Sequence, residues 1–238
     1  MELPFLYDGT IQRRYKRFLA DVTLADGREV VAHCPNTGSM QGCWQPDAPV
    51  QVSHSDNPKR KLQWTLERVD MGNGWIGVHT GRVNAVIAEG ISNNGIPALA
   101  HYKQVTREPQ FNIKGHPRSR FDCLLTRGVN RDCYVEVKNT TLLVNDTIQF
   151  PDAVTERGRK HLDLLAIAVK QGFRGVILFA VNRPEGHSFE AAAQIDPAYA
   201  DTLEMVVKKG VEVVVVRLRH TQRGIGIGGS TAFDQSYI

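Results

Sequence analysis

Two carboxylates and a lysine are spaced so that they could meet on one face of a predicted hairpin. Residues 134–138 read Tyr-Val-Glu-Val-Lys. Because side chains alternate along a strand, Glu136 and Lys138 share one face and the two valines face the core. The segment 127–132 predicts a turn centred between residues 129 and 130. Antiparallel pairing about that centre places Asp122 opposite Glu136 or Val137.

This grouping has a chemical use. Asp122 and Glu136 could hold a hard divalent cation, Mg²⁺ or Mn²⁺, which keeps open positions for water and a phosphate oxygen. Lys138 could orient the attacking water or stabilise developing charge. Glu89, on a predicted preceding helix, could supply a further carboxylate or a base. The alternative is a Glu–Lys pair on a solvated sheet face, which contributes little to stability. Catalysis requires room for an ion among these side chains.

Composition is that of an ordinary soluble protein, with 42% hydrophobic and 23% charged residues in a chain of 238. No segment has the length and apolarity of a membrane span, and the start MELPFLYDGT lacks the pattern of a secretion signal. We therefore expect a cytoplasmic protein with no membrane partner. The four cysteines contain no C-x-x-C pair, so we expect reduced thiols packed as small apolar side chains.

Three clusters of cations favour a polyanionic partner, although each could also be a solvated face. The partner expected is DNA, held through phosphates, with little sequence preference and an affinity that falls with salt. His161 adjoins the third cluster and is either a proton carrier or structural. The sequence leaves the oligomeric state open, a homodimer included. The candidate contacts are Arg13, Arg14, Lys16 and Arg17, then Lys59, Arg60 and Lys61, and finally Arg157 and Lys160.

The segment 33–40, His-Cys-Pro-Asn-Thr-Gly-Ser-Met, has the composition of a tight loop beside a strand. The side chain of Asn36 and backbone N–H groups at 37–39 could meet a phosphate. An internally hydrogen-bonded turn is an equal alternative.

The first 81 residues predict a small β-barrel resembling an OB fold. Five short alternating segments are found there, and an Asp-Gly turn links the first two as a hairpin. No convincing helix interrupts them, which favours a closed or nearly closed barrel. The predicted strands are 18–24, 29–33, 49–53, 62–68 and 75–79.

Residues 82–238 predict an α/β domain with a mixed sheet, because helical and strand patterns alternate. A helix is expected from Arg82 to the Asn-Asn-Gly at 93–95, and a polar, turn-rich stretch at 101–120. Asp152 is the predicted N-cap of a helix over 153–171 that Gly172 ends. Strands are expected at 175–181, 188–195 and 211–218, with a helix from Pro197 to Lys209. The glycine-rich residues 223–231 lack the phosphate-loop ending and predict a mobile terminus.

Several blocks resemble the sugar fermentation stimulation protein A family, and the resemblance spans nearly the whole chain. They are YKRFLAD (15–21), HCPNTGSM (33–40), SDNPKRK (55–61), RSRFD (118–122), YVEVK (134–138) and FPDAVTERGRKHL (150–162). The resemblance implies an OB-like barrel followed by a PD-(D/E)XK nuclease-like, restriction-endonuclease-like domain. It also implies DNA binding linked to the regulation of sugar use.

By position, the resemblance places the nuclease-like signature on Asp122, Glu136 and Lys138, with Glu89 on the helix before them. The proline of that signature is absent, because Phe121 precedes Asp122. The leading hypothesis is therefore a DNA-binding protein that hydrolyses phosphodiester bonds with Mg²⁺. The alternative is a noncatalytic DNA-binding regulator of sugar metabolism genes.

Overall fold

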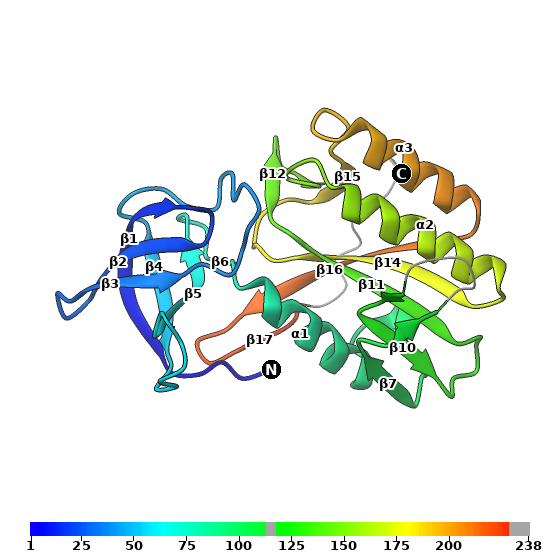
Figure 1. The fold of residues 1–238 in the computed structure, drawn as a ribbon, viewed down its shortest axis with the longest axis horizontal. Coiled ribbons are helices and arrows are strands. Elements are labelled where there is room, and N and C mark those ends of the chain that lie inside the picture. The colour runs from blue at the N-terminus through cyan, green and yellow to red at the C-terminus, as the bar shows by residue number, and fades with distance from the viewer. Residues whose placement is uncertain (113–117, 229–238) are drawn as a thin grey trace.

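The computed structural model describes residues 1–112 and 118–228, which form a barrel followed by a sheet domain (Figure 1). The barrel strands follow the order β3-β2-β1-β4-β5-β6, and a further pairing between β3 and β5 closes the sheet on itself. The predicted OB-like barrel is thus confirmed. Its strands are β1 (Leu6–Tyr15), β2 (Leu19–Leu24), β3 (Glu29–His33), β4 (Pro49–His54), β5 (Trp64–Asp70) and β6 (Trp75–Gly77).

Alternation and two irregularities explain how these strands close. In β2, Ala20, Val22 and Leu24 are buried while the intervening side chains are partly exposed, so one face fills the barrel. The register shifts in β1 between Ile11 and Arg13, and again in β4. Such bulges bend a strand and increase its twist, which lets a short sheet curl round.

The longest barrel strand, β1, was missed from the sequence. It pairs with both β2 and β4 and therefore lies at the centre of the barrel sheet. Asp8-Gly9 in its first half and a run of arginines in its second half hide the alternation. Gly9 is required there, because a Cβ would lie 2.6 Å from the backbone oxygen of Thr23.

The second domain contains the predicted mixed sheet, in the order β17-β16-β14-β11-β10-β7. The central strands β11, β14 and β16 are parallel, and the outer three are antiparallel to their neighbours. A three-stranded sheet, β12-β13-β15, and a small pair, β8-β9, lie beside it. The strands are β7 (Gln104–Arg107), β8 (Gln110–Phe111), β9 (Ser119–Arg120), β10 (Cys123–Thr126), β11 (Cys133–Thr140), β12 (Leu142–Val144), β13 (Thr147–Phe150), β14 (Arg174–Val181), β15 (Ser188–Ala191), β16 (Glu212–His220) and β17 (Ile225–Ile227).

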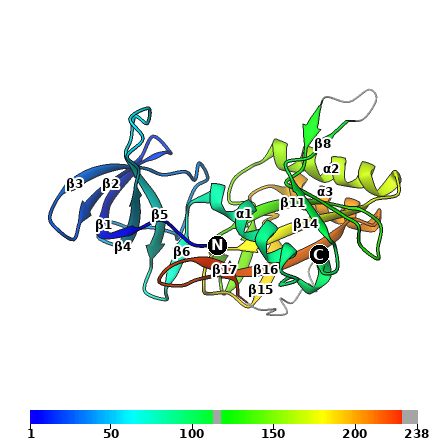
Figure 2. The same ribbon diagram turned by 90° about the horizontal axis from the view of Figure 1, so that it is seen from below.

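Helices cover both faces of this sheet (Figures 1 and 2). Helix α1 (Thr80–Ser92) packs on one face with Val135 and Val137, in one hydrophobic core. Helices α2 (Glu156–Lys170) and α3 (Pro197–Lys208) cover the other face in a second core. Strand β14 is buried along nearly its whole length, as its continuous apolar sequence predicted. A short 3₁₀ turn, η1 (Pro97–Leu99), follows α1.

The helices of the described chain have 13, 15 and 12 residues, and none is both long and apolar enough to cross a bilayer. All four cysteines are free and buried, as expected of small apolar side chains.

Several sequence predictions in this domain were wrong in detail. Helix α2 is capped by Thr155, whose hydroxyl accepts from the Gly158 amide, and not by Asp152. The latter accepts hydrogen bonds from Ser39 and Met40 in the barrel instead. The stretch 101–120 contains strands β7, β8 and β9, and β15 ends at residue 191. Residues 225–227 form β17 on the edge of β16, so this part of the tail is ordered; residues 229–231 lie outside the described chain.

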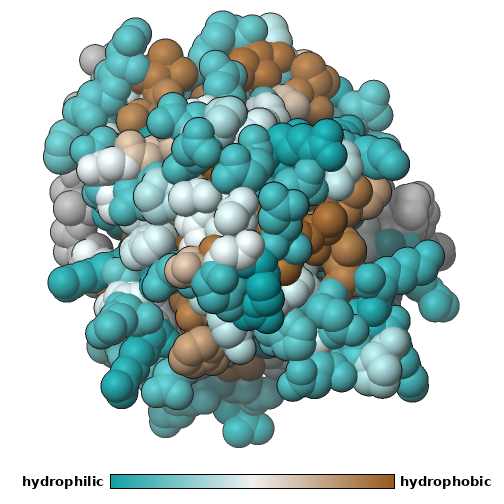
Figure 3. Space-filling view, turned by 90° about the vertical axis from the view of Figure 1, so that its left-hand side faces the viewer, coloured by the Kyte–Doolittle hydropathy of each residue, from teal (hydrophilic) through white to brown (hydrophobic). Residues whose placement is uncertain are grey.

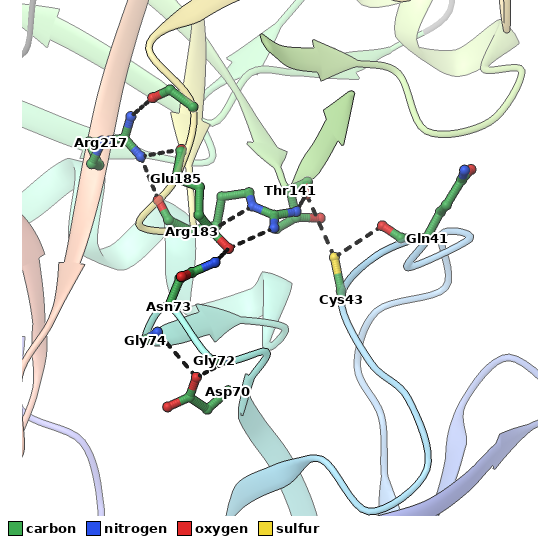
Figure 4. A network of polar contacts seen from close by, with 11 residues as sticks. Gln41, Cys43, Asp70, Gly72, Asn73, Gly74, Thr141, Arg183, Glu185 and Arg217 are labelled. Carbon is green, nitrogen blue, oxygen red and sulfur yellow. Dashed lines mark hydrogen bonds and ion pairs between the residues drawn. The ribbon is translucent and has the colours of Figure 1, made fainter. Parts of the chain in front are cut away.

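The two domains are joined by buried polar contacts. Asn182, at the end of β14, accepts from the Gly77 amide through its backbone oxygen (2.8 Å) and bonds Asn139 and His220 through its side chain. A Cβ on residue 77 would lie 2.3 Å from that side chain, so only glycine fits. Figure 4 shows Arg183 paired with Glu185, and the same carboxylate accepts a hydrogen bond from the side chain of Asn73 in the barrel.

A buried ion pair links β5 to α1. Glu67 is 2% exposed and accepts from Arg82 Nε (2.6 Å) and from Ser53 Oγ (2.7 Å). Burial acts to raise the pKa of Glu67, but the hydrogen bonds from Arg82 and Ser53 outweigh it and lower the pKa overall. The ionised carboxylate therefore stabilises the folded protein.

We expect Glu67→Gln to destabilise the protein by about 3 kcal/mol at pH 7, because it breaks a largely buried pair. The folded-state pKa lies below that of the unfolded chain, about 4.3. The stabilisation that ionised Glu67 provides is therefore complete above about pH 4.3, the unfolded pKa, and is lost as the pH falls through the pKa of the folded protein. Urea unfolding of the wild type and Glu67→Gln should show a smaller difference in the free energy of unfolding at pH 3.5 than at pH 7. Glu204→Gln, which breaks an exposed pair with Lys208, is the control and should stay within about 0.5 kcal/mol.

Candidate metal and nucleic-acid site

The site lies where β10 parts from β11. Cys123 pairs with Val135, and the Asp122 amide still donates to the Val135 oxygen (3.1 Å). Asp122 is thus level with Glu136 and Val137, as the hairpin register predicted. Beyond that point β11 continues to Thr140 and pairs only with β14 in the main sheet. The Val137 amide, which has lost its strand partner, donates to Asp122 Oδ2 (2.7 Å).

The other oxygen of this carboxylate contacts α1. Asn84 Nδ2 donates to Asp122 Oδ1 at 2.7 Å. Burial and then the charge of Glu136 raise the pKa of Asp122. The register of the hairpin agrees with this influence, because it places Asp122 level with Glu136. Nothing in the local sequence marked Asn84, because its contact with residue 122 depends on how α1 packs.

Glu136 lies in the interior, with 3% of its surface exposed. Its Oε1 accepts from Lys138 Nζ (2.6 Å) and is also bonded to His161 Nδ1. Within the described chain, its Oε2 is buried and has no hydrogen-bond partner. Burial acts to raise the pKa of Glu136, but the bond with His161 and the charge of Lys138 outweigh it and lower the pKa overall.

His161 is placed by the packing of α2. Leu162 and Leu165 of this helix are fully buried against the sheet. Asp196, the N-cap of α3, accepts from the Thr155 amide and from Arg159, which ties the starts of the two helices together. The histidine, considered from sequence as a proton carrier, therefore faces the strand that carries the carboxylate.

A pocket of about 460 Å³ adjoins His161. Among the described residues its lining contains three arginines and no acidic residue, which suits a phosphate; Arg120 also lies 3.9 Å from the carboxylate of Glu108. Arg157 was expected near the site, whereas Arg118 and Arg120 were not. Their alternation just before Asp122 was the signal that could have identified them. The lining residues are Gln110, Arg118, Ser119, Arg120, Arg157 and His161. Lys160 is exposed on α2 and does not line this pocket.

Glu89 is not brought to this site. Its Oε1 accepts from the amino group of Met1 at 2.8 Å, and about half of its side chain is exposed. The face of α1 that reaches Asp122 is that of Asn84. The predicted third carboxylate is thus replaced by the amide of Asn84 in the observed contacts.

Most of the predicted barrel cations contact the barrel itself. Arg14 donates to the backbone oxygens of residues 17, 36 and 38, and Arg17 donates to the oxygen of Thr37. Arg13 pairs with Asp21 and lies over the Tyr15 ring, whereas Lys16 is exposed at the turn between β1 and β2. Three cations therefore hold the 36–38 loop and the hairpin in place.

The loop at Asn36 is internally bonded, in agreement with the alternative given above. Asn36 is buried, and its Oδ1 accepts from the Gly38 amide at 2.9 Å. In the second cationic cluster, Arg60 donates to Thr65, and Lys59 and Lys61 are exposed. These two lysines are available for a partner.

The residues present fit a divalent cation that keeps most of its waters. No group of three or more His, Cys, Asp or Glu side chains within residues 1–112 and 118–228 is arranged to hold a metal ion. Mg²⁺, however, is usually bound by one or two carboxylates plus water and phosphate. Asp122 and Glu136 supply two carboxylates. The Oε2 of Glu136 accepts no hydrogen bond from the described residues, so it is the oxygen that a cation could contact.

Comparison with known proteins agrees with the architecture. One family model, the SfsA N-terminal OB domain, matches residues 13–78, and another, the sugar fermentation stimulation protein RE domain, matches residues 81–224. The chain belongs to the sugar fermentation stimulation protein family. A sugar fermentation stimulation protein homolog of Magnetococcus marinus is 50% identical over 216 residues, covering 90% of this chain and 91% of that one. One from Geobacter sulfurreducens is 49% identical, with 89% of each chain covered.

A solved structure shares the whole fold. It is described as "The structure of Pyrococcus Furiosus SfsA in complex with Ca2+" and matches with a TM-score of 0.85, covering 98% of each chain at 23% sequence identity. At that identity the likeness establishes the fold of both domains together.

We expect the charges on β11 to depend on each other in the metal-free protein. Lys138→Met leaves a buried carboxylate with one partner fewer and should destabilise the protein. Adding Glu136→Gln should recover part of the loss, with a coupling energy of about 1–3 kcal/mol in a double-mutant cycle measured by urea unfolding. Additive effects would show that the pair does not interact. Lys160→Met, an exposed lysine on α2, is the control.

Proposed function

We propose that this protein binds nucleic acid and hydrolyses phosphodiester bonds with a divalent cation at Asp122, Glu136 and Lys138. The observation that carries the proposal is the buried, unpartnered Oε2 of Glu136. Glu136 is level with Asp122 across the hairpin, and it is bonded to His161, which lines the pocket that contains three arginines. An orphan carboxylate oxygen in a protein interior is costly unless something occupies it. A cation meets that need, and the arginines suit a phosphate.

The chain's own residues divide the work. Asp122 and Glu136 would hold the cation, which when bound lowers the pKa of its water and offsets negative charge on the phosphate. Arg118, Arg120 and Arg157 bind the phosphate group and orient it toward the carboxylates. Lys138 is next to Glu136 and can orient the attacking water or stabilise charge in the transition state.

The solved relative supports the cation. The Pyrococcus furiosus SfsA structure is described as a complex with Ca²⁺, a hard cation that takes oxygen ligands. Mg²⁺ and Mn²⁺ accept the same kind of ligand, so the two carboxylates here suit all three. Calcium is therefore included with Mg²⁺ and Mn²⁺ in the thermal test below.

DNA is the proposed partner, held through its phosphates without strong sequence preference. The exposed Lys16, Lys59 and Lys61 and the arginine pocket supply contacts that read no base edges. We place this activity in the cytoplasm and connect it to sugar use through the family to which the chain belongs.

One observation favours a second function, that of a noncatalytic DNA-binding regulator of sugar metabolism genes. Lys138 and His161 both bond the same oxygen of Glu136, so the charge is already compensated without a metal. If these contacts persist in solution with metal present, only binding remains. The two tests below separate the functions.

Divalent cations should stabilise the folded protein, because they bind the folded site and not the unfolded chain. At a concentration of about 100 Kd the gain is about 2.7 kcal/mol, a rise of several degrees in Tm. We expect Mg²⁺, Mn²⁺ or Ca²⁺ to raise the Tm of the wild type, and Asp122→Asn or Glu136→Gln to abolish the rise. Glu89→Gln should keep it, because that carboxylate contacts the amino terminus. An unchanged rise in Glu136→Gln would place the metal elsewhere.

Cleavage should require the same residues. We expect the wild type to cut labelled DNA, offered as single-stranded, duplex and branched substrates, with Mg²⁺ or Mn²⁺ but not with EDTA. Glu136→Gln and Lys138→Met should lower the rate by at least about 100-fold, because each removes a group that acts on the reacting phosphate. Asp163→Asn, an exposed acid on α2, should cut like the wild type. Equal residual cutting by all variants would indicate a contaminating nuclease and favour the noncatalytic binder.

A further inference from the structure

A row of aromatic rings crosses the end of the barrel at which β1 begins. The ring centroids of Phe5 and Tyr7 are 4.8 Å apart, those of Tyr7 and Trp64 are 4.9 Å apart, and those of Trp64 and His54 are 4.7 Å apart. The guanidinium of Arg28 lies over Trp64, 5.6 Å from its centroid. We call these five side chains the aromatic row.

Part of the row packs against the barrel core, and part of it is exposed to solvent. Tyr7 and Trp64 are half-buried and pack against the barrel core, so core packing explains why these two residues are aromatic. Phe5 is 76% exposed, more than the other exposed aromatic residue of the barrel, Phe18, at 46%. The barrel end of the molecule is otherwise mainly hydrophilic, with separate apolar patches (Figure 3). Core packing therefore accounts for two of the rings but not for Phe5.

Cations flank the row. The loop 55–63 connects the two paired residues His54 and Trp64 and carries Lys59 and Lys61, both exposed. Within the described chain neither lysine forms an ion pair. The acidic groups here are Asp56, which faces His54, Asp26, which faces Arg28, and Glu2 and Asp8, which line a surface pocket together with Phe5 and Arg223. Among the described cations beside the row, those without an acidic partner are in the 59–61 loop, so that loop is the part of the surface that complements a polyanion.

We propose that the aromatic row binds the bases of a single-stranded nucleic acid while the 59–61 loop contacts its backbone. Ring faces beside cations are the surface that proteins use for single strands, because every base has a π-face to stack. A duplex hides those faces inside its own stack and offers only phosphates. OB-type barrels also bind oligonucleotides on their strands and loops. The proposal extends the function proposed above by naming single-stranded nucleic acid as the preferred class.

Binding can be measured separately from cleavage. A fluorescein-labelled thymidine 20-mer is titrated with full-length protein carrying Glu136→Gln, in EDTA, and its anisotropy is followed. In this background we compare Phe5→Ala, Phe5→Leu and Phe5→Tyr; the 76% exposed side chain can be changed with little effect on folding. Phe5→Ala and Phe5→Leu should weaken binding by roughly ten-fold, whereas Phe5→Tyr should bind like the parent. Lys59→Ala/Lys61→Ala should lower both the affinity and its salt dependence.

Three outcomes would overturn the proposal. Phe5→Leu binding like the parent would show that apolar bulk, not stacking, is read at this position. Phe18 lies at the opposite end of β1, so a loss in Phe18→Ala with none in Phe5→Ala would place the strand at the other end of the barrel. A duplex of the same length should bind all Phe5 variants equally; an equal loss on duplex would overturn the preference for single strands. Because Glu136→Gln is present throughout, failure here leaves the hydrolysis tests untouched.

Discussion

A carboxylate buried on the central strand β11 is the interaction on which the rest of the site depends. Glu136 cannot remain charged in the interior without compensation, since an isolated buried charge costs many kcal/mol. Lys138 compensates it from the same face of the strand, two residues on, and His161 does so from α2. The position of α2 is thus set by the polar contact of His161 and by the buried Leu162 and Leu165 beside it.

The same strand explains why the site is open on one side. Where β10 turns away, β11 would present an unpaired amide, and the carboxylate of Asp122 takes the place of the missing strand. The divergence of β10 from β11 thus both frees the Val137 amide and places the Asp122 carboxylate against it. A second negative charge is held beside the first although burial and that neighbour raise its pKa, an arrangement that costs stability and is typical of functional sites.

The sequence could predict contacts between residues that are near each other in the chain, but not contacts between distant ones. Alternation and hairpin register are local, and they placed Asp122, Glu136 and Lys138 together. The cap of α2 was mispredicted because Asp152 has the right chemistry at the right spacing, yet its partners lie more than a hundred residues away in the barrel. Asn84 and Glu89 share one helix, and only tertiary packing decides which of them reaches the site. The arginines at 14 and 17 looked free in sequence because their acceptors are backbone oxygens of a distant loop.

The buried contacts between the domains determine whether the barrel could assist the proposed chemistry at all. Binding energy gained on one domain positions a substrate on the other only if the two do not turn freely. Here the Gly77 amide meets Asn182, the Glu67–Arg82 pair joins β5 to α1, and the first residues of the chain pair with residue 224 before entering the barrel. Helix α1, which Arg82 ties to the barrel, also carries the Asn84 that bonds Asp122. In the proposed function, a strand bound to the barrel would therefore be held in a fixed position relative to Asp122, because α1 contacts both.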